Sequence, residues 1–282
     1  MTVPSNLSDS FKRRILIAFD TETTGMWAPT NRIVEIAAVR FSLTHGDLGI
    51  YQSLVNPGRH IPEEVTQIHG ITDDMVESAP HIKPVLEEFG AFCGVDSTLI
   101  AHNAPFDISF VGCELDRAGL AFGDNPILDT VDICHRFFPG LASYSLLNLA
   151  RHFNIAQSQE HRALSDALIV KQLLLKAIEK MNETGAGVDI EETLTVHRMS
   201  AWQGEPTILP DEFADIQQAI AERRKLEIDY NHPVKSSATR TIHPQQVFKL
   251  GAVFYINAYC ELARAERTFR LDRIISYRVL QD

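Results

Sequence analysis

The chain has 282 residues, of which 45% are hydrophobic and 22% are charged, and its formal net charge at neutral pH is −11. This composition is typical of a globular protein with one large or two modest domains, and it excludes disordered, collagen-like and low-complexity chains. No run approaches the roughly 18 consecutive apolar residues of a membrane-spanning helix, so we expect no contact with a membrane. The polar N-terminal 14 residues also lack the apolar core of a signal peptide.

The cysteines indicate a compartment. Four of them are scattered along the chain without a C-x-x-C pair: Cys93, Cys113, Cys134 and Cys260. This spacing argues against a disulfide framework and against a zinc knuckle. It therefore predicts a protein of the reduced cytoplasm.

Charge is distributed unevenly along the chain. Residues 1–210 carry 15 basic and 27 acidic side chains, whereas residues 211–282 carry 11 basic and 10 acidic ones. Within residues 223–278 there are 11 basic and 5 acidic side chains. A locally basic C-terminal module fits contact with a polyanion, which the acidic N-terminal part would repel unless it carried metal ions. Both patterns are also consistent with surfaces that only keep the protein in solution.

The N-terminal part is predicted to form a mixed sheet with helices on its faces. Apolar runs at 14–20, 33–41 and 51–55 predict three strands, and the absence of a helical pattern between them predicts an antiparallel meander. Helical patterns then alternate with short strands. The helices are expected at 85–92, 105–118, 145–153 and 162–180, and the strands at 98–101 and 128–133.

The C-terminal part has a different pattern. Residues 182–210 are rich in glycine and proline and read as a linker, with one short ordered piece at 193–202. An amphipathic helix at 212–224 then precedes closely spaced β-like runs, which predict a small antiparallel barrel. These runs are 226–230, 239–243, 246–250, 252–259, 267–271 and 274–280. The predicted division is thus domain 13–180, linker 181–210 and domain 211–282.

Three separate segments place carboxylates at the ends of predicted elements. Asp20 and Glu22 follow a buried strand and lie two residues apart, so strand alternation lets them converge. Asp107 lies in the first turn of a predicted helix, where the helix dipole alone would favour a carboxylate. His161 and Asp166 would point about 140° apart on one continuous helix, so they share a site more easily if His161 lies in the preceding loop. Taken singly, each segment is also explained by a turn, a helix cap or a surface residue.

Together the four carboxylates could meet at one edge of the sheet. At ~4 Å separation and an effective dielectric of ~20, each like-charge pair would cost about 4 kcal/mol, so protons or cations must neutralise the cluster. Oxygen ligands favour hard ions such as Mg²⁺ or Mn²⁺. Two such ions ~3.5–4 Å apart would bind both the attacking and the leaving oxygen of a phosphodiester, with His161 as general base on the attacking water.

Five motifs closely resemble, in order, those of the DEDDh or DnaQ-like 3′–5′ exonucleases. They are FDTETTG at 19–25, IVEIA at 33–37, HGIT at 69–72, HNAPFD at 102–107 and HRALSD at 161–166. The resemblance covers about residues 13–180 and implies a ribonuclease-H-like fold with two divalent cations. The related DEDDy class has a tyrosine where this chain has Arg162.

The resemblance also implies a role for each matching residue. His161 would be the general base, and the metal ligands would be Asp20, Glu22, Asp107 and Asp166. The loop at 26–31 would border the terminal nucleotide. Candidate substrate-binding residues are Thr21, Thr23, His102 and Asn103, although a structural role explains His102 better. His69 is expected to order a turn.

The C-terminal module resembles the WYL domain over about residues 213–280. Pro244 and the run RTFRLDRI at 267–274 match, whereas the name-giving triplet appears as FYI at 254–256. The resemblance implies a small Sm- or SH3-like barrel that senses a ligand or nucleic acid. Candidate contacts are a stacking tyrosine, Tyr255 or Tyr259, and an arginine patch formed by Arg240, Arg264, Arg267, Arg270 and Arg273. The arginines could instead only support the barrel by pairing with Glu261, Glu266 and Asp272, with Arg273–Asp272 the expected pair.

The sequence as a whole predicts a metal-dependent 3′–5′ exonuclease. It would act on single-stranded DNA or RNA 3′ ends and release nucleoside 5′-monophosphates, and the WYL-like module would hold the strand or bind a nucleotide or nucleic-acid ligand that tunes activity. The alternatives are an RNA 3′-end trimming nuclease, a polymerase proofreading subunit and a non-catalytic nucleic-acid-binding regulator. The motifs do not separate DNA from RNA, because loop residues that the motifs do not identify contact the 2′-hydroxyl.

Overall fold

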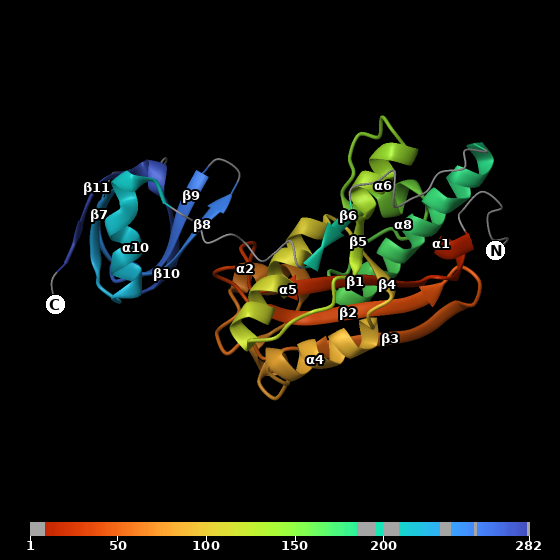
Figure 1. Cartoon of the computed structure of the whole chain (residues 1–282), viewed down its shortest axis with the longest axis horizontal. Coiled ribbons are helices and arrows are strands. Elements are labelled where there is room, and N and C mark those ends of the chain that lie inside the picture. Colours follow the sequence, from red (N-terminus) through yellow and green to blue (C-terminus); the bar gives the residue numbers. More distant parts are fainter. Residues whose placement is uncertain (1–8, 185–195, 200–208, 232–237, 251–252, 281–282) are drawn as a thin grey trace. The chain divides into compact units, whose positions relative to one another are not determined.

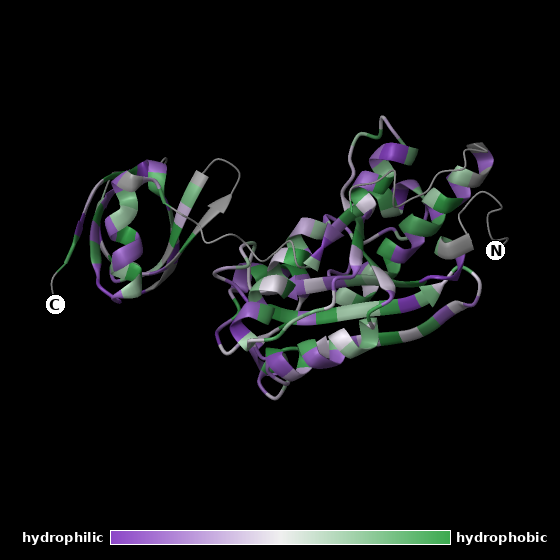
Figure 2. Ribbon diagram, viewed as in Figure 1, coloured by the Kyte–Doolittle hydropathy of each residue, from purple (hydrophilic) through white to green (hydrophobic). Residues whose placement is uncertain are grey.

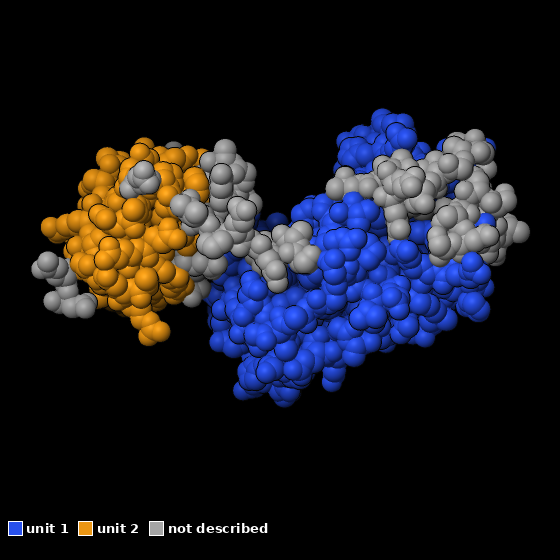
Figure 3. All heavy atoms as spheres, viewed as in Figure 1, with its two compact units in different colours: residues 1–203 blue, residues 204–282 orange. Residues whose placement is uncertain are grey.

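The computed structural model describes residues 9–184, 196–199, 209–231, 238–250 and 253–280 (Figure 1). The chain divides into two compact units, residues 1–203 and 204–282, which Figure 3 shows in different colours. None of the helices in these described ranges combines the length and the apolar character needed to cross a membrane.

The first unit is built on a six-stranded mixed sheet. Its strands are β1 (Ile15–Thr23), β2 (Ile33–Ser42), β3 (Gly46–Leu54), β4 (Ser97–Ala101), β5 (Pro126–Asp129) and β6 (Val196–Arg198). The first three form the predicted antiparallel meander, β4 and β5 run parallel to β1, and β6 is antiparallel to β5. The strand order is β3-β2-β1-β4-β5-β6. Strand β6 therefore lies inside the predicted linker 181–210, within the stretch 193–202 where a short ordered piece is expected.

Helices cover both faces of this sheet, as Figure 1 shows. They are α1 (Asp9–Arg13), α2 (Glu63–His69), α3 (Asp73–Val76), α4 (Ile82–Cys93), α5 (Ala104–Ala118), α6 (Thr130–Phe137), α7 (Leu146–His152) and α8 (Ala163–Thr184). Strand alternation gives two cores: Leu16 and Ala18 pack with α6, α7 and α8, whereas Ile17 and Phe19 pack with α4 and α5. Figure 2 shows hydrophobic residues along β2, the strand between β3 and β1.

The predicted strand at 128–133 is wrong in its second half. β5 ends at Asp129, and residues from Thr130 onward form α6. The Asp129 carboxylate accepts a hydrogen bond from the N–H of Val131 at 2.8 Å, which caps the new helix. An apolar run of this length is ambiguous between strand and helix, and the capping carboxylate decides it here.

The second unit is a five-stranded antiparallel sheet. After the turn η2 (Asp211–Phe213) and helix α10 (Ala214–Ala221), the chain forms β7 (Leu226–Tyr230), β8 (Ala238–Leu250), β9 (Val253–Cys260), β10 (Ala265–Arg270), the turn η3 (Leu271–Arg273) and β11 (Ile274–Val279). The order is β10-β9-β8-β7-β11, and α10 contributes Ile216 and Ala219 to the core. The two runs predicted at 239–243 and 246–250 are one strand, β8, whose register shifts between Pro244 and Gln246. This shift fits a proline, which has no N–H to donate to a ladder.

Both parts of the predicted fold class are confirmed, a mixed sheet flanked by helices and a small all-β domain. Within the described residues no ladder joins β10 to β11, so the second sheet is an open half-barrel there.

Candidate active site

The carboxyl end of β1 carries Asp20 and Glu22 on the face that α8 covers, because they continue the alternation of Leu16 and Ala18. Helix α8 begins at Ala163, so His161 does lie in the preceding loop, with a left-handed φ of 49°.

This loop placement lets the imidazole and the carboxylate of the last motif share one site. Ligand atoms of Glu22, His161 and Asp166 all lie within 4.8 Å of one another. The structure therefore brings together three of the five predicted catalytic residues in one cluster.

Asp107 approaches the same edge from the α5 side. It lies in the first turn of α5 and is 2% exposed. The hydroxyl of Thr21, which alternation places on the α5 face of β1, donates to Asp107 Oδ1 at 2.7 Å. Strand β1 thus carries two carboxylates, Asp20 and Glu22, on one face. On its other face, the Thr21 hydroxyl binds a third carboxylate, that of Asp107.

Burial raises the pKa of all four carboxylates, and repulsion from other members of the set raises it further at Asp20 and Glu22. Burial and then the charges of Asp107, Asp166 and Glu22 raise the pKa of Asp20 well above its usual range. Burial is also the largest cause at Glu22 and Asp107, whose pKa values rise to about 8 and about 7, and it raises the pKa of Asp166. Such raised pKa values are expected at a cation site, because the bound cation supplies the positive charge that lets buried carboxylates ionise.

The two carboxylate oxygens of Asp166 differ in their hydrogen bonding. Gln159 Nε2 donates to Asp166 Oδ2 at 2.5 Å. Asp166 Oδ1 is buried and has no hydrogen-bond partner among the residues that the structure describes. Leaving such an oxygen unsatisfied is costly, and carboxylate oxygens with one imidazole are a donor set for a divalent cation. The residues present therefore fit a divalent-cation site.

A fifth buried carboxylate, Glu35 on β2, has its countercharge inside the protein. It lies directly opposite Glu22 in the β1–β2 ladder. Arg162 donates to both of its oxygens, at 2.7 and 3.0 Å, and Ala163 N–H and Gln52 Nε2 donate at 3.0 and 2.9 Å. Burial raises the pKa of Glu35, but these hydrogen bonds outweigh burial and lower it. Glu35 thus anchors the start of α8, next to the candidate base.

Sequence reasoning assigned no role to Glu35, Gln159 or Asp129. A signal existed for Glu35, because a charged residue inside the apolar run IVEIAAV indicates a buried, paired charge. The bond from Gln159 depends on a loop conformation that no sequence pattern indicates.

The hydroxyls of Thr21 and Thr23 both have partners inside the protein. Thr21 donates to Asp107, and Thr23 donates to the carbonyl of Gly25 at 2.7 Å. Both residues are buried. These hydroxyls therefore stabilise the end of β1, and their predicted contact with substrate stays a prediction.

His102 and Asn103 form the junction between β4 and α5. His102 Nδ1 forms a 2.8 Å hydrogen bond with the Thr130 hydroxyl, and that hydroxyl also lies 3.2 Å from the carbonyl of Ala101. Burial lowers the pKa of His102. Asn103 has a left-handed φ of 61° and donates its N–H to Asp129 Oδ1, and the residue is exposed. Asn103 is thus the more exposed of the two.

His69 orders its turn as expected. It is 2% exposed, and its Nδ1 accepts a hydrogen bond from the N–H of Ile71 at 3.0 Å. Burial lowers the pKa of this imidazole.

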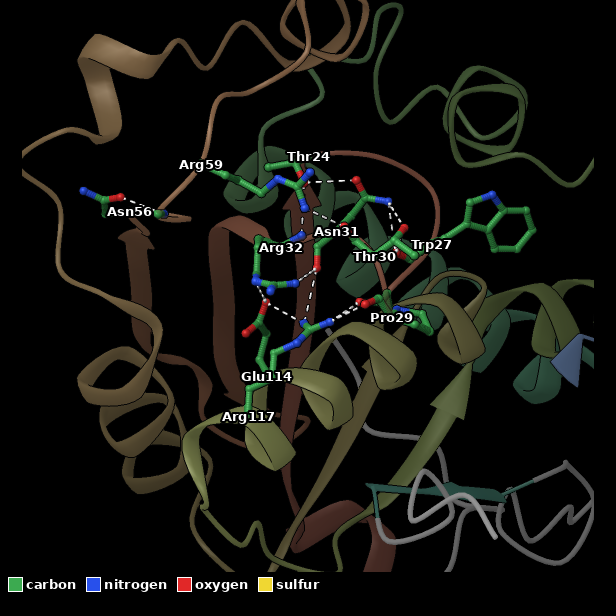
Figure 4. A network of polar contacts seen from close by, with 12 residues as sticks. Thr24, Trp27, Pro29, Thr30, Asn31, Arg32, Asn56, Arg59, Glu114 and Arg117 are labelled. Carbon is green, nitrogen blue, oxygen red and sulfur yellow. Dashed lines mark hydrogen bonds and ion pairs between the residues drawn. The ribbon is translucent and has the colours of Figure 1, made fainter. Parts of the chain in front are cut away.

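The loop after β1 exposes two large apolar side chains, Met26 (69% exposed) and Trp27 (41%). The Trp27 carbonyl accepts hydrogen bonds from the N–H groups of Thr30 and Asn31, which closes a compact turn. Figure 4 shows the indole of Trp27 pointing away from the polar network of this loop.

The arginines of the predicted patch in the second unit differ in their contacts. Arg270 makes a paired contact with Asp272, at 3.0 and 2.7 Å, so the expected Arg273–Asp272 pair is replaced by Arg270–Asp272. Arg240 Nη1 lies 3.8 Å from Cys260 Sγ, and its Nε is buried without a hydrogen-bond partner in the described part of the chain. Arg264 has a left-handed φ of 48°. Of the remaining candidates, Arg267 and Tyr259 are exposed and Tyr255 is partly buried.

A mixed sheet whose edge gathers carboxylates and a histidine, followed by a small antiparallel sheet, defines a nuclease domain joined to a second, β-rich module. The sequence model of the exonuclease family RNase_T matches residues 17–174, and that of the WYL domain matches residues 211–279. The chain belongs to this exonuclease family, and its C-terminal module is a WYL domain.

Curated relatives are components of bacterial DNA polymerases. The chain is 35% identical over 185 residues to DNA polymerase III subunit epsilon of Treponema pallidum, a match that covers 64% of this chain and 85% of that protein. It is 34% identical over 168 residues to the PolC-type DNA polymerase III of Halalkalibacterium halodurans, covering 59% of this chain but only 12% of the polymerase. The predicted enzyme class, a 3′–5′ exonuclease, is thus confirmed at the level of the domain.

Solved structures confirm the fold. One, titled as the 3′-end specific recognition of histone mRNA stem-loop by 3′-exonuclease, has a TM-score of 0.56 at 15% identity, covering 71% of this chain and 74% of that chain. The nuclease domain of 3′hExo, a DEDDh family member bound to rAMP, has a TM-score of 0.53 at 15% identity, covering 65% and 96%.

Proposed function

We propose that the chain hydrolyses the terminal phosphodiester at single-stranded 3′ ends and releases nucleoside 5′-monophosphates, with two Mg²⁺ or Mn²⁺ ions held by Asp20, Glu22, Asp107 and Asp166. The observation that carries this proposal is the cluster of Glu22, His161 and Asp166, in which one buried carboxylate oxygen has no hydrogen-bond partner among the described residues.

Each residue of the site has a task in this reaction. Bound divalent cations would offset the charge of the scissile phosphate and make the attacking water more acidic. His161 accepts the proton of that water while its oxygen forms the bond to phosphorus and the 3′-oxygen of the preceding nucleotide leaves. Thr21 and Gln159 hold the carboxylates of Asp107 and Asp166 in place.

DNA is the substrate that we favour. The relatives at 34–35% identity are DNA polymerase components, whereas the likeness to RNA-binding structures at 15% identity concerns the fold alone. The exposed Met26 and Trp27 beside the end of β1 offer an apolar surface suited to stacking on bases. Comparison of rates on matched DNA and RNA oligomers tests this preference, and a faster rate on RNA would favour the RNA-trimming alternative.

The decisive experiment follows a single strand labelled at either end, with Mg²⁺ or Mn²⁺ and with EDTA. A 5′ label should give a descending ladder, and a 3′ label should appear at once in mononucleotide. EDTA should stop both reactions. Endonucleolytic fragments would contradict the polarity, and tight binding without any turnover would indicate the non-catalytic regulator.

Proofreading for a polymerase is the second candidate, favoured by the match with subunit epsilon over 85% of its length. Such a subunit is expected to remove a mismatched primer terminus faster than a paired one, and to associate with a polymerase catalytic subunit. Equal rates on both termini would argue against it.

We further propose that the WYL domain binds a nucleotide or a polynucleotide through Arg240 and Arg267. Arg240 lies opposite Ile228 in the β7–β8 ladder and Arg267 opposite Ala258 in the β9–β10 ladder. Both opposite residues are 0% exposed, so the two arginines share the core face of the sheet. The Nε of Arg240, which is buried and has no hydrogen-bond partner within the described ranges, supports a role in binding an anion there.

Binding of a labelled single strand by the full chain in EDTA tests the WYL proposal. The double change Arg240→Ala/Arg267→Ala should weaken binding about tenfold and flatten its salt dependence. Arg270→Ala is the matched control, because Asp272 already binds that guanidinium. Equal losses in both variants would contradict the assignment.

A further inference from the structure

Helix α5 holds the loop at residues 24–32, which joins β1 to β2 and which we call the β1–β2 loop. Arg117, in the last turn of α5, donates Nη2 to the carbonyls of Ala28 and Pro29, each at 2.8 Å. Its Nη1 donates to the carbonyl of Asn31 at 3.3 Å. One guanidinium therefore binds three carbonyls of the loop (Figure 4).

Glu114 fixes the direction of that guanidinium. Its Oε1 accepts a hydrogen bond from Arg117 Nη1 at 3.1 Å and lies 4.0 Å from Arg32 Nε. Its side chain is 2% exposed. Because a buried carboxylate requires a cationic or hydrogen-bonding partner, Glu114 keeps Arg117 aimed at the loop.

The β1–β2 loop is also closed by its own side chains. The Thr24 hydroxyl donates to Asn31 Oδ1 at 3.2 Å and accepts from the N–H of Arg32 at 3.0 Å. A Cβ at Gly25 would lie 2.7 Å from Asn31 Oδ1, so this closure requires glycine. Arg59 Nη1 adds a 2.6 Å bond to the carbonyl of Thr30.

We propose that Arg117 is a positioning residue that holds Met26 and Trp27 ready for the 3′ end of a polynucleotide, and so sets its affinity. A preorganised loop loses less conformational freedom on binding, which strengthens binding without new contacts. The Arg117 bonds described here end on loop carbonyls and on Glu114, so the hydrolytic step should proceed unchanged once substrate is bound. This inference rests on the proposed exonuclease function.

Two variants test the proposal. Arg117→Ala removes the three loop bonds but leaves Glu114 without its closest cation. Arg117→Ala/Glu114→Gln removes that charge as well, and so separates loop anchoring from the cost of an unpaired buried carboxylate. The matched control is Arg198→Ala on β6, because Arg198 likewise binds a carbonyl (2.7 Å) and a carboxylate (3.0 Å), both of Asp124.

The first readout is amide hydrogen exchange in the metal-free protein. Both Arg117 variants should accelerate exchange in residues 26–32 about tenfold and leave β4 unchanged, whereas Arg198→Ala should leave the β1–β2 loop protected. The second readout is kinetic: KM for a single-stranded oligonucleotide should rise about tenfold while kcat stays within about twofold.

The outcomes distinguish failure of the Arg117 positioning role from failure of the proposed exonuclease function. Unchanged loop exchange, or exchange that rises throughout the unit, would overturn the positioning role. A fall in kcat at unchanged KM would also overturn it, because Arg117 would then act on the chemical step. If the wild-type chain digests no strand, the proposed function fails, yet the exchange comparison still decides whether Arg117 anchors the loop.

Discussion

At the scale of single residues, the buried acids of the first unit differ in where their countercharge comes from. Glu35 receives it from Arg162, which lowers its pKa. The acids at the end of β1 and in the last motif have raised pKa values, and burial is the largest cause at each. The second group therefore destabilises the metal-free protein at neutral pH, and this instability is the expected cost of a cation site.

The change Asp166→Asn should move activity and stability in opposite directions. Loss of one charged ligand should lower exonuclease activity by roughly 100-fold or more. The thermal midpoint in EDTA should rise, because one member of the repelling cluster is gone. Calorimetry and the labelled-strand assay check both effects, with the exposed Asp116→Asn as control. A lower midpoint would show that Asp166 is primarily a structural residue.

Stability of the metal-free protein should fall as pH rises from about 5 to about 8. The folded-state pKa of Glu22, about 8, lies above its usual value of 4.5, so the folded state binds the extra proton in this window. The stabilisation is complete below the ordinary pKa and is lost as pH rises through the folded value. Thermal midpoints across this range should slope downward in EDTA, more weakly with Mn²⁺, and more weakly in Glu22→Gln. A flat profile in EDTA would contradict the raised pKa.

At the scale of elements, the start of α8 decides whether His161 and Asp166 can act together. The helix begins at Ala163, whose N–H donates to Glu35 on β2. Glu35 thus supplies from a distant strand the acceptor that a capping residue usually provides. The loop can therefore place His161 off the helix, in a left-handed conformation.

Glu35→Gln should lower kcat about 10- to 100-fold with little change in KM, because the charge that holds Arg162 and the start of α8 is lost. The pH dependence of kcat should shift as well, since the imidazole of His161 would no longer be held in one environment. Gln52→Ala removes one neutral bond to the same carboxylate and should have a much smaller effect. Equal effects of the two changes would contradict a special role for the Arg162–Glu35 pair.

Elements with strong periodic patterns were predictable. The strand at 98–101 and the helix at 105–118 agree with the structure to within one residue at each end. The strand at 128–133 was not, because a carboxylate cap rather than periodicity ends β5. The five catalytic candidates came from motifs, and the cluster of Glu22, His161 and Asp166 agrees with three of them. Gln159 acts through the shape of its loop and Arg117 through partners distant in the chain, and neither leaves a local pattern. Glu35 differs, because its charge stands out inside an apolar run although its partner Arg162 does not.

At the scale of the whole molecule, the two units differ in charge. The residues from 223 to 278 carry 11 basic and 5 acidic side chains, whereas residues 1–210 carry 15 and 27. If the WYL domain contributes to binding of a strand, the exchange of counterions at this basic segment should govern affinity for long substrates.

Salt should therefore affect long and minimal substrates differently. Between about 50 and 200 mM salt, KM for an oligonucleotide should rise at least tenfold, whereas hydrolysis of a nitrophenyl ester of a nucleoside 5′-monophosphate should change little. The two titrations, made on the same full chain, check this directly. Parallel salt effects on both substrates would place the electrostatic contribution in the nuclease site itself.

Asp129 connects two helices of the first unit through one carboxylate. It accepts hydrogen bonds from the N–H groups of Asn103 and Ala104 at the start of α5, and from Val131 at the start of α6. Since Asp107 is in the first turn of α5, we expect a substitution at 129 to displace this proposed metal ligand, 22 positions away in the sequence. A random-mutagenesis screen for inactive clones would consequently recover changes at 129 as often as changes in the reacting groups, and only metal affinity measured clone by clone would tell the two kinds apart.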